Sequence, residues 1–176
     1  MDYAAAFALA LAGDLAQSRA LAQVLAREFP EDTSVQFIYL PTLRALFSLN
    51  TPTPDAAAAI QALQTASRYD LALGRVGFIG RFGGLYPIYG RGLAYLAARQ
   101  PGEAAAEFQR ILDHRSIVLV DPMGAMARLQ LAGALALSGD IVKAKSAYGD
   151  LLTLWKNADA DIPVLKAARA EYARLP

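Results

Sequence analysis

Apolar residues recur at helical spacing along most of this chain, and the pattern is clearest between Leu85 and Trp155. This stretch contains LYPIYGRGLAYLAARQPGEAAAEFQRIL and, further on, GAMARLQLAGALALSGDIVKAKSAYGDLL. When the two segments are aligned, every matched residue lies 40 positions further along the chain. The matched pairs are Gly92 with Ala132, Leu96 with Ala136, Ala104 with Ala144, Phe108 with Tyr148 and Ile111 with Leu151. The pattern therefore predicts two helical hairpins of the same kind.

A small residue in the first helix, a small residue early in the second and an aromatic residue four positions later are typical of tetratricopeptide repeats. The usual period of this repeat is about 34 residues, and we attribute the longer spacing here to the connection from His114 to Pro122. One hairpin cannot bury both of its faces, so neighbouring hairpins must stack. The sequence therefore predicts an all-α, tetratricopeptide-like solenoid of about four hairpins with a C-terminal capping helix. The alternative is a non-repetitive helical bundle.

The same pattern extends towards the N-terminus, so we expect a single domain over residues 1–176. The segment LALAGDLAQSRALAQVLAREFPED again combines a helix, a Gly-Asp turn, a second helix and a proline, and its Gly13-Asp14 corresponds to Gly139-Asp140. The expected divisions are two hairpins in 1–68, a glycine-rich connection in 69–84, the two clearest hairpins in 85–156 and a capping helix in 162–174.

Local signals predict three further details. In the helix expected over 31–50, Thr33 or Ser34 is the candidate N-cap, and Pro41 either kinks the helix or begins it again. The β-branched run Ser116–Val120 predicts a short, buried, extended segment. Asp161 is expected to cap the last helix.

Composition narrows the class of protein. Charged residues make up 19% of the chain, less than in an average globular protein, and a net charge of +1 favours neither nucleic acid nor an anionic membrane surface. The apolar run YAAAFALALAG is too short to span a bilayer, and Asp2 precedes it where a signal peptide would be basic. We expect a cytoplasmic protein without membrane insertion. The absence of cysteine is equally compatible with the periplasm.

Residues for catalysis or metal binding are scarce. His114 is the only histidine and there is no cysteine, so a zinc site is not expected. Asn157-Ala-Asp159-Ala-Asp161 resembles the start of a calcium loop, but Ile162 replaces the required glycine and Ala168 the required glutamate. We therefore expect no enzyme activity, metal or cofactor.

The glycines at 74, 77, 80, 83 and 84, together with Arg75 and Arg81, could surround a phosphate group. No phosphate-binding sequence motif accompanies them, so a flexible connection is the simpler interpretation. A small-molecule sensor using this loop remains an alternative function.

The first helices of tetratricopeptide hairpins line a concave groove, which makes their aromatic and charged residues candidates for partner binding. A charged clamp for carboxylates is not expected, because the fourth hairpin offers Met126, Leu129 and Gly133 there. We therefore predict an apolar groove that binds a protein or peptide, or one filled by another part of the chain. A homodimer is the alternative. The candidate partner-binding residues are Tyr39, Arg44, Tyr86, Tyr89, Arg91, Met126 and Leu129.

Nearly the whole chain resembles the C-terminal tetratricopeptide region of bacterial eukaryotic-like serine/threonine kinases and related winged-helix regulators, abundant in acidobacteria. The most specific residues are DHR at 113–115, DP at 121–122, LAGALALSGD at 131–140 and AYGDLLTLWKNADADIP at 147–163. The kinase motifs are absent, and Ser116 stands where the HRD triplet would need aspartate. The resemblance implies a sensor or scaffold module.

Overall fold

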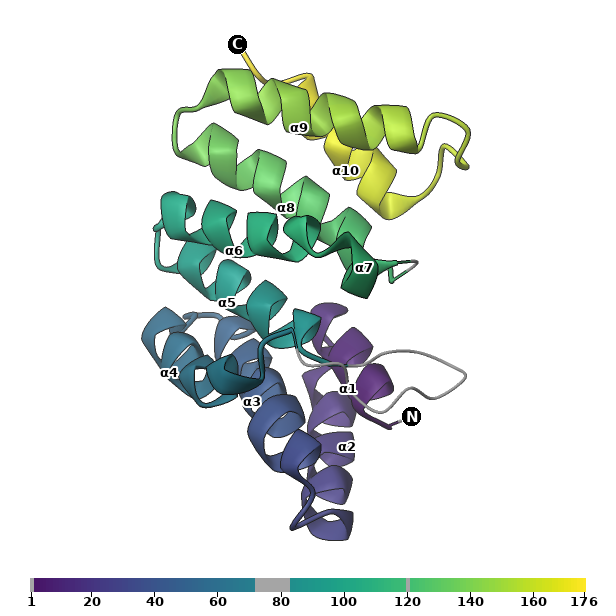
Figure 1. Cartoon of the computed structure of the whole chain (residues 1–176). Coiled ribbons are helices and arrows are strands. Elements are labelled where there is room, and N and C mark those ends of the chain that lie inside the picture. Colours follow the sequence, from purple (N-terminus) through teal and green to yellow (C-terminus); the bar gives the residue numbers. More distant parts are fainter. Residues whose placement is uncertain (1, 72–82, 120) are drawn as a thin grey trace. The chain divides into compact units, whose positions relative to one another are not determined.

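Figure 1 shows the chain as a computed structural model, which describes residues 2–71, 83–119 and 121–176. These residues form helices and no strand, so the all-α prediction is confirmed. Their contacts divide the chain into two compact units, which we call unit 1 (Met1–Ala98) and unit 2 (Arg99–Pro176), and each is described by itself. The boundary falls within the stretch Leu85–Trp155, at the point where the sequence predicts the turn of a hairpin.

Unit 1 pairs its first helices in sequence. α1 packs against α2, α3 packs against α4, and α5 lies against both α3 and α4 (Figure 1). Ala45, Ala59, Leu63 and Ala94 form a buried cluster between these last three helices. The elements are α1 (Asp2–Leu11), α2 (Leu15–Glu28), the π-helix η1 (Val35–Tyr39), α3 (Leu40–Leu49), α4 (Ala56–Ala66), the 3₁₀ turn η2 (Ser67–Tyr69) and α5 (Leu85–Ala97).

Unit 2 is built around one central helix. α8 packs against α6 and α9, and α10 packs against α8 and α9 (Figure 1). The elements are α6 (Pro101–Asp113), α7 (Arg115–Val118), α8 (Met123–Leu137), α9 (Ile141–Leu154) and α10 (Pro163–Tyr172).

Two interhelical turns, one in each unit, have the same backbone geometry. Gly13 follows α1 with a φ of 86°, and Gly139 follows α8 with a φ of 87°, a left-handed conformation that glycine adopts without steric cost. The next residue caps the following helix, because Asp14 and Asp140 each accept a hydrogen bond at 3.1 Å from the backbone N–H three residues later. The correspondence of the two Gly-Asp turns is therefore found in the structure as well as in the sequence.

The helices α2, α4, α6 and α9 bury the same positions after their N-caps, which are Asp14, Asp55, Gln100 and Asp140. Four residues after the cap lie Ser18, Ala59, Ala104 and Ala144, all with 0% exposure. The eighth residues (Ala22, Leu63, Phe108, Tyr148) and the eleventh residues (Leu25, Ala66, Ile111, Leu151) are also buried. Ser18 is tolerated in this series because its hydroxyl donates a 2.6 Å hydrogen bond to the Ala6 carbonyl.

The helix before Pro41 accommodates this proline through a π-helical turn. The Leu40 N–H bonds to the Val35 carbonyl, five residues back, and Pro41 follows in the first turn of α3, where its missing N–H is tolerated. The backbone is helical at every residue from 33 to 49, so the π-helical turn carries the helix past Pro41 without a break. The predicted N-caps are wrong, because Ser34 makes no side-chain cap and the carboxylate of Asp32 accepts the Val35 N–H at 2.9 Å instead.

Two other local predictions are wrong. Within the run expected to be extended, Ser116–Val118 belongs to α7, because the Val118 and Leu119 amides bond to carbonyls four residues back at 3.0 Å, and Leu119 is 61% exposed. Val120 lies outside the described residues. Local helical hydrogen bonds outweigh the strand propensity of so short a run. Asp161 does not cap α10, since Ile162 is the N-cap and takes the extended conformation favoured before a proline. No helix in the described ranges is long and apolar enough to cross a membrane.

Candidate functional site

A hollow of about 500 Å³ lies in unit 2, between α6, α8 and α9. It collects residues from the exposed side of α6 and α9 and from the part of α8 between them. The lining residues are Gln109, Leu112, Asp113, Arg115, Arg128, Leu131, Leu135, Lys143, Ser146, Ala147 and Asp150. We call this the unit 2 hollow.

The unit 2 hollow combines apolar surface with charges of both signs. Leu131 is 7% exposed, and Leu112 and Leu135 are half-buried, so part of their apolar surface faces the hollow. Arg115 and Asp150 are exposed, and neither forms an ion pair with any residue that the structure describes. Apolar side chains beside charged groups of this kind are suited to a peptide more than to a small apolar ligand.

Other charged groups around the hollow are already engaged. Lys143 pairs with Asp140 at 2.7 Å, and this hydrogen bond lowers the pKa of Asp140 and raises that of Lys143. Arg128 donates to the Gly124 carbonyl at 3.2 Å within its own helix. These contacts hold the side chains in place at the edge of the hollow.

A smaller hollow of about 220 Å³ lies in unit 1, between α2 and α3. It uses the same positions of the second helix as the unit 2 hollow: Gln23 and Gln109 lie nine residues after their N-caps, and Ala26 and Leu112 lie twelve residues after them. The lining residues are Arg19, Ala22, Gln23, Ala26, Leu40, Arg44 and Phe47. We call this the unit 1 hollow, and Arg44 is the predicted site residue that lines it.

Two of the tyrosines predicted to bind a partner, Tyr39 and Tyr86, lie in an aromatic cluster with Tyr3 and Phe7 of unit 1, and Tyr89 is buried. Tyr39 is half-buried and stacks on Tyr3, with ring centroids 3.9 Å apart. Tyr86 meets Phe7 edge-on at 4.7 Å, and Tyr86 and Tyr89 are only 6% and 2% exposed. The prediction that Tyr86 and Tyr89 line a groove open to a partner is therefore wrong, because the first two turns of α5 are buried on every side and present no free face.

Arg91 is also buried. Its guanidinium donates to Asp70 at 2.6 Å, and the two side chains are 7% and 3% exposed. The prediction of a surface arginine beside the tyrosines is wrong, because α5 turns this side chain towards the interior and a buried cation requires a paired anion.

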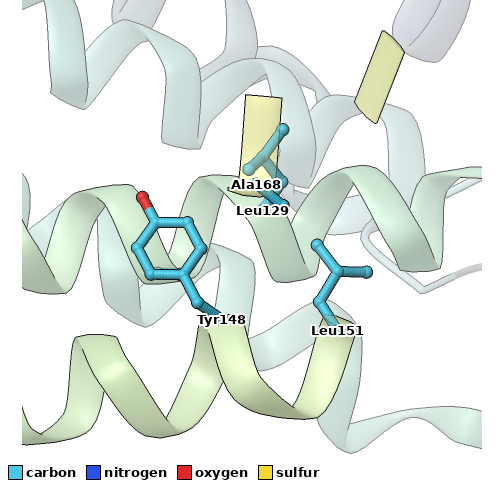
Figure 2. Packing of buried hydrophobic residues seen from close by; sticks show 5 residues of the cluster. Leu129, Tyr148, Leu151 and Ala168 are labelled. Carbon is cyan, nitrogen blue, oxygen red and sulfur yellow. The ribbon is translucent and has the colours of Figure 1, made fainter. Parts of the chain in front are cut away.

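Leu129, one of the predicted apolar positions on α8, is covered by α10. Figure 2 shows Leu129 close to Ala168 of α10 and to Tyr148 and Leu151 of α9. Leu129 is 9% exposed and Met126 is half-buried. A methyl group at Gly133 would lie 3.7 Å from the Glu171 carboxylate, so α10 approaches this face closely. The face of α8 that carries Leu129 therefore packs against α10 and is not open to a partner.

Other candidates from the sequence take no part in either hollow. The Nδ1 atom of His114 lies 2.7 Å from the Arg110 carbonyl, within the same helix end. The glycine-rich phosphate candidate, with Arg75 and Arg81, lies outside the described residues. Among the described residues, no group of three or more His, Cys, Asp or Glu side chains could hold a metal ion.

Apart from Arg44, sequence reasoning missed the residues that line the two hollows. It assigned binding to the first helix of each hairpin, whereas Gln23 and Gln109 belong to second helices. Gln23 and Gln109 lie at the same distance from their N-caps, and this can be read from the sequence. Only the burial of the surrounding residues in the structure shows whether such an outward polar residue lies beside a hollow or on an ordinary surface. Comparison of the chain with known protein families, with curated protein sequences and with solved structures gives no match in any of the three.

Proposed function

We propose that this chain is a non-catalytic, tetratricopeptide-like scaffold that binds a segment of another protein. The fold proposal is supported by the three positions that recur, all buried, in four second helices, and by the matching turns at Gly13 and Gly139. Stacked helical hairpins of this kind are generally used for binding rather than for chemistry. The resemblance of the sequence to C-terminal regions of bacterial kinases is the reason for proposing a role in signalling.

The binding proposal rests on one observation, the unit 2 hollow. Its apolar surface is bordered by Arg115 and Asp150, which lack ion pairs among the described residues and can therefore bind charges of a ligand. A peptide segment with apolar side chains between charged ones would bury its apolar side chains in the hollow and pair its charged side chains with Arg115 and Asp150. The proposed binding site is therefore a different surface from the face of α8 that carries Leu129, which packs against α10.

Selection from a phage-displayed library of random peptides tests this function. The binding of the enriched peptides is then measured by fluorescence anisotropy. Ser146→Trp places a large side chain in the unit 2 hollow and should weaken binding at least about tenfold. Thr153→Trp is the matched control, because Thr153 is another exposed residue of α9 but does not line the hollow. Failure to enrich any peptide that distinguishes the two variants would contradict the proposal.

Self-association is a second candidate function, favoured by two exposed apolar residues at the α8–α9 turn. Leu137 and Val142 are 72% and 81% exposed and lie on either side of this turn. Light scattering over a range of protein concentrations tests it. A dimer that becomes monomeric on Val142→Lys would support self-association, and a monomer at all concentrations would refute it.

A further inference from the structure

The unit 1 hollow differs from the unit 2 hollow in its charges. Arg19 and Arg44 both line it, and none of its lining residues is acidic. Neither arginine forms an ion pair with a residue that the structure describes. Because two guanidinium groups face one small hollow without a carboxylate, the electrostatic complement of this surface is an anion.

The rest of the lining limits what that anion can be. Ala22, Ala26, Leu40 and Phe47 contribute apolar atoms, and Gln23 contributes an amide able to bond a peptide backbone. The volume of about 220 Å³ is smaller than the roughly 300–1,000 Å³ of most cofactor and small-molecule pockets. The hollow therefore fits one or two side chains of a longer molecule that extends beyond it.

One of the two arginines is already held in position. The guanidinium carbon of Arg19 lies 5.3 Å from the centroid of the Phe47 ring, at cation–π distance. This contact restricts the side chain before any ligand binds, which lowers the entropy lost when it pairs with a carboxylate. Arg44 projects from α3 into the same hollow and is exposed.

We propose that the unit 1 hollow binds an acidic peptide segment, with a glutamate or aspartate carboxylate between Arg19 and Arg44 and an apolar side chain against Phe47. This site is formed by other helices than the unit 2 hollow, and it does not depend on the function proposed for that hollow.

Peptides selected from the random library on the full-length chain are the probes. The wild-type chain should enrich sequences rich in aspartate and glutamate, and the tightest of these is labelled for fluorescence anisotropy. The double variant Arg19→Glu/Arg44→Glu should weaken its binding by about tenfold or more. Replacing the acidic residues of the peptide with glutamine or asparagine should have a similar effect. The control variant Arg27→Glu/Arg68→Glu makes the same charge change at exposed positions of unit 1 outside the hollow and should bind like wild type.

Four outcomes would overturn the proposal. The first is enrichment of no acidic peptide by the wild-type chain. The second is equal loss of binding in the two double variants, which would show only a general effect of net charge. The third is a wild-type dimer that the Arg19→Glu/Arg44→Glu variant alone dissociates, which would assign the surface to a second copy of the chain. If Ser146→Trp weakened binding of the acidic peptide and Arg19→Glu/Arg44→Glu did not, the peptide would bind in the unit 2 hollow and not in the unit 1 hollow.

Discussion

The phenolic hydroxyl of Tyr148 on α9 donates a 2.5 Å hydrogen bond to the carboxylate of Glu171 on α10. Tyr172 adds an edge-on ring contact to the same tyrosine, with centroids 6.2 Å apart. Together with the packing of Ala168 on Leu129 (Figure 2), these contacts hold α10 against α8 and α9. Tyr148 also occupies one of the positions that every second helix buries, so the attachment of α10 uses a residue of the hairpin core.

Tyr148→Phe should therefore lower the free energy of unfolding of unit 2 by about 1 kcal/mol, since Glu171 is half-buried and water can partly replace the lost donor. Burial and the bond to Glu171 raise the pKa of Tyr148 well above its usual value of 10.0. The folded state then keeps this proton at a pH where the unfolded state loses it. The stabilisation is complete below about pH 10 and is lost as the pH rises further.

Urea unfolding followed by the fluorescence of Trp155, the only tryptophan, measures this effect in unit 2. The difference between wild type and Tyr148→Phe should be largest at pH 7 to 9 and should shrink by pH 11. Tyr172→Phe is the control, because its hydroxyl has no hydrogen bond to any residue that the structure describes and its ring contact is retained. If the difference in unfolding free energy between wild type and Tyr148→Phe grew with pH, the hydrogen bond from Tyr148 to Glu171 would not be its cause.

Two glycines of unit 2 should respond to alanine in opposite directions. Gly139 has a φ of 87°, which a Cβ disfavours, so Gly139→Ala should destabilise unit 2 by about 1–2 kcal/mol. Gly149 lies within α9 and an added methyl group would meet nothing within 4 Å, so Gly149→Ala should stabilise it by about 0.5–1 kcal/mol. Thermal unfolding by circular dichroism compares the two variants with wild type. If both substitutions changed the stability in the same direction, the turn geometry at Gly139 would be wrong.

Gly124 allows α7 to pack closely on the start of α8. A methyl group at this position would lie 2.5 Å from Cγ1 of Val118, which is buried and has a stiff, branched side chain. Gly124→Ala should therefore cost about 1–3 kcal/mol. In the background of Val118→Ala, which removes the clashing atom, the same change should cost much less. A double-mutant cycle from urea unfolding gives the coupling, and additive effects would contradict the close contact.

Much of the fold is predictable from the sequence because it depends on periodic, local signals. The apolar spacing, the Gly-Asp turns and the prolines locate most helices within a few residues. The exceptions are at short segments, where several conformations are close in energy. Asp32 replaces Ser34 as a cap, and the β-branched residues of α7 form a helical turn.

The candidate site was harder to predict, because exposure depends on contacts between elements that are distant in sequence. Tyr86 and Arg91 have the chemistry of a binding surface, yet the packing of α5 buries them. Arg44 has similar chemistry and is exposed, because it lies between α2 and α3 where the helices leave a hollow. The helical spacing of the sequence does not distinguish the buried Tyr86 and Arg91 from the exposed Arg44.

The ion pair of Arg91 with Asp70 gives a last prediction. Both side chains are almost fully buried, so Arg91→Leu removes a close counter-charge from the buried carboxylate of Asp70 and should destabilise unit 1 by about 3–5 kcal/mol. The double variant Arg91→Leu/Asp70→Leu should cost less than the sum of its single changes, because each single change breaks the same ion pair. Arg27→Leu is the control: Arg27 and Glu28 lie 3.9 Å apart with 77% and 51% exposure, and its loss should change stability by less than about 0.5 kcal/mol. Urea unfolding followed by circular dichroism measures all of these variants. An Arg91→Leu chain as stable as the Arg27→Leu control would mean that the pair is open to water in solution.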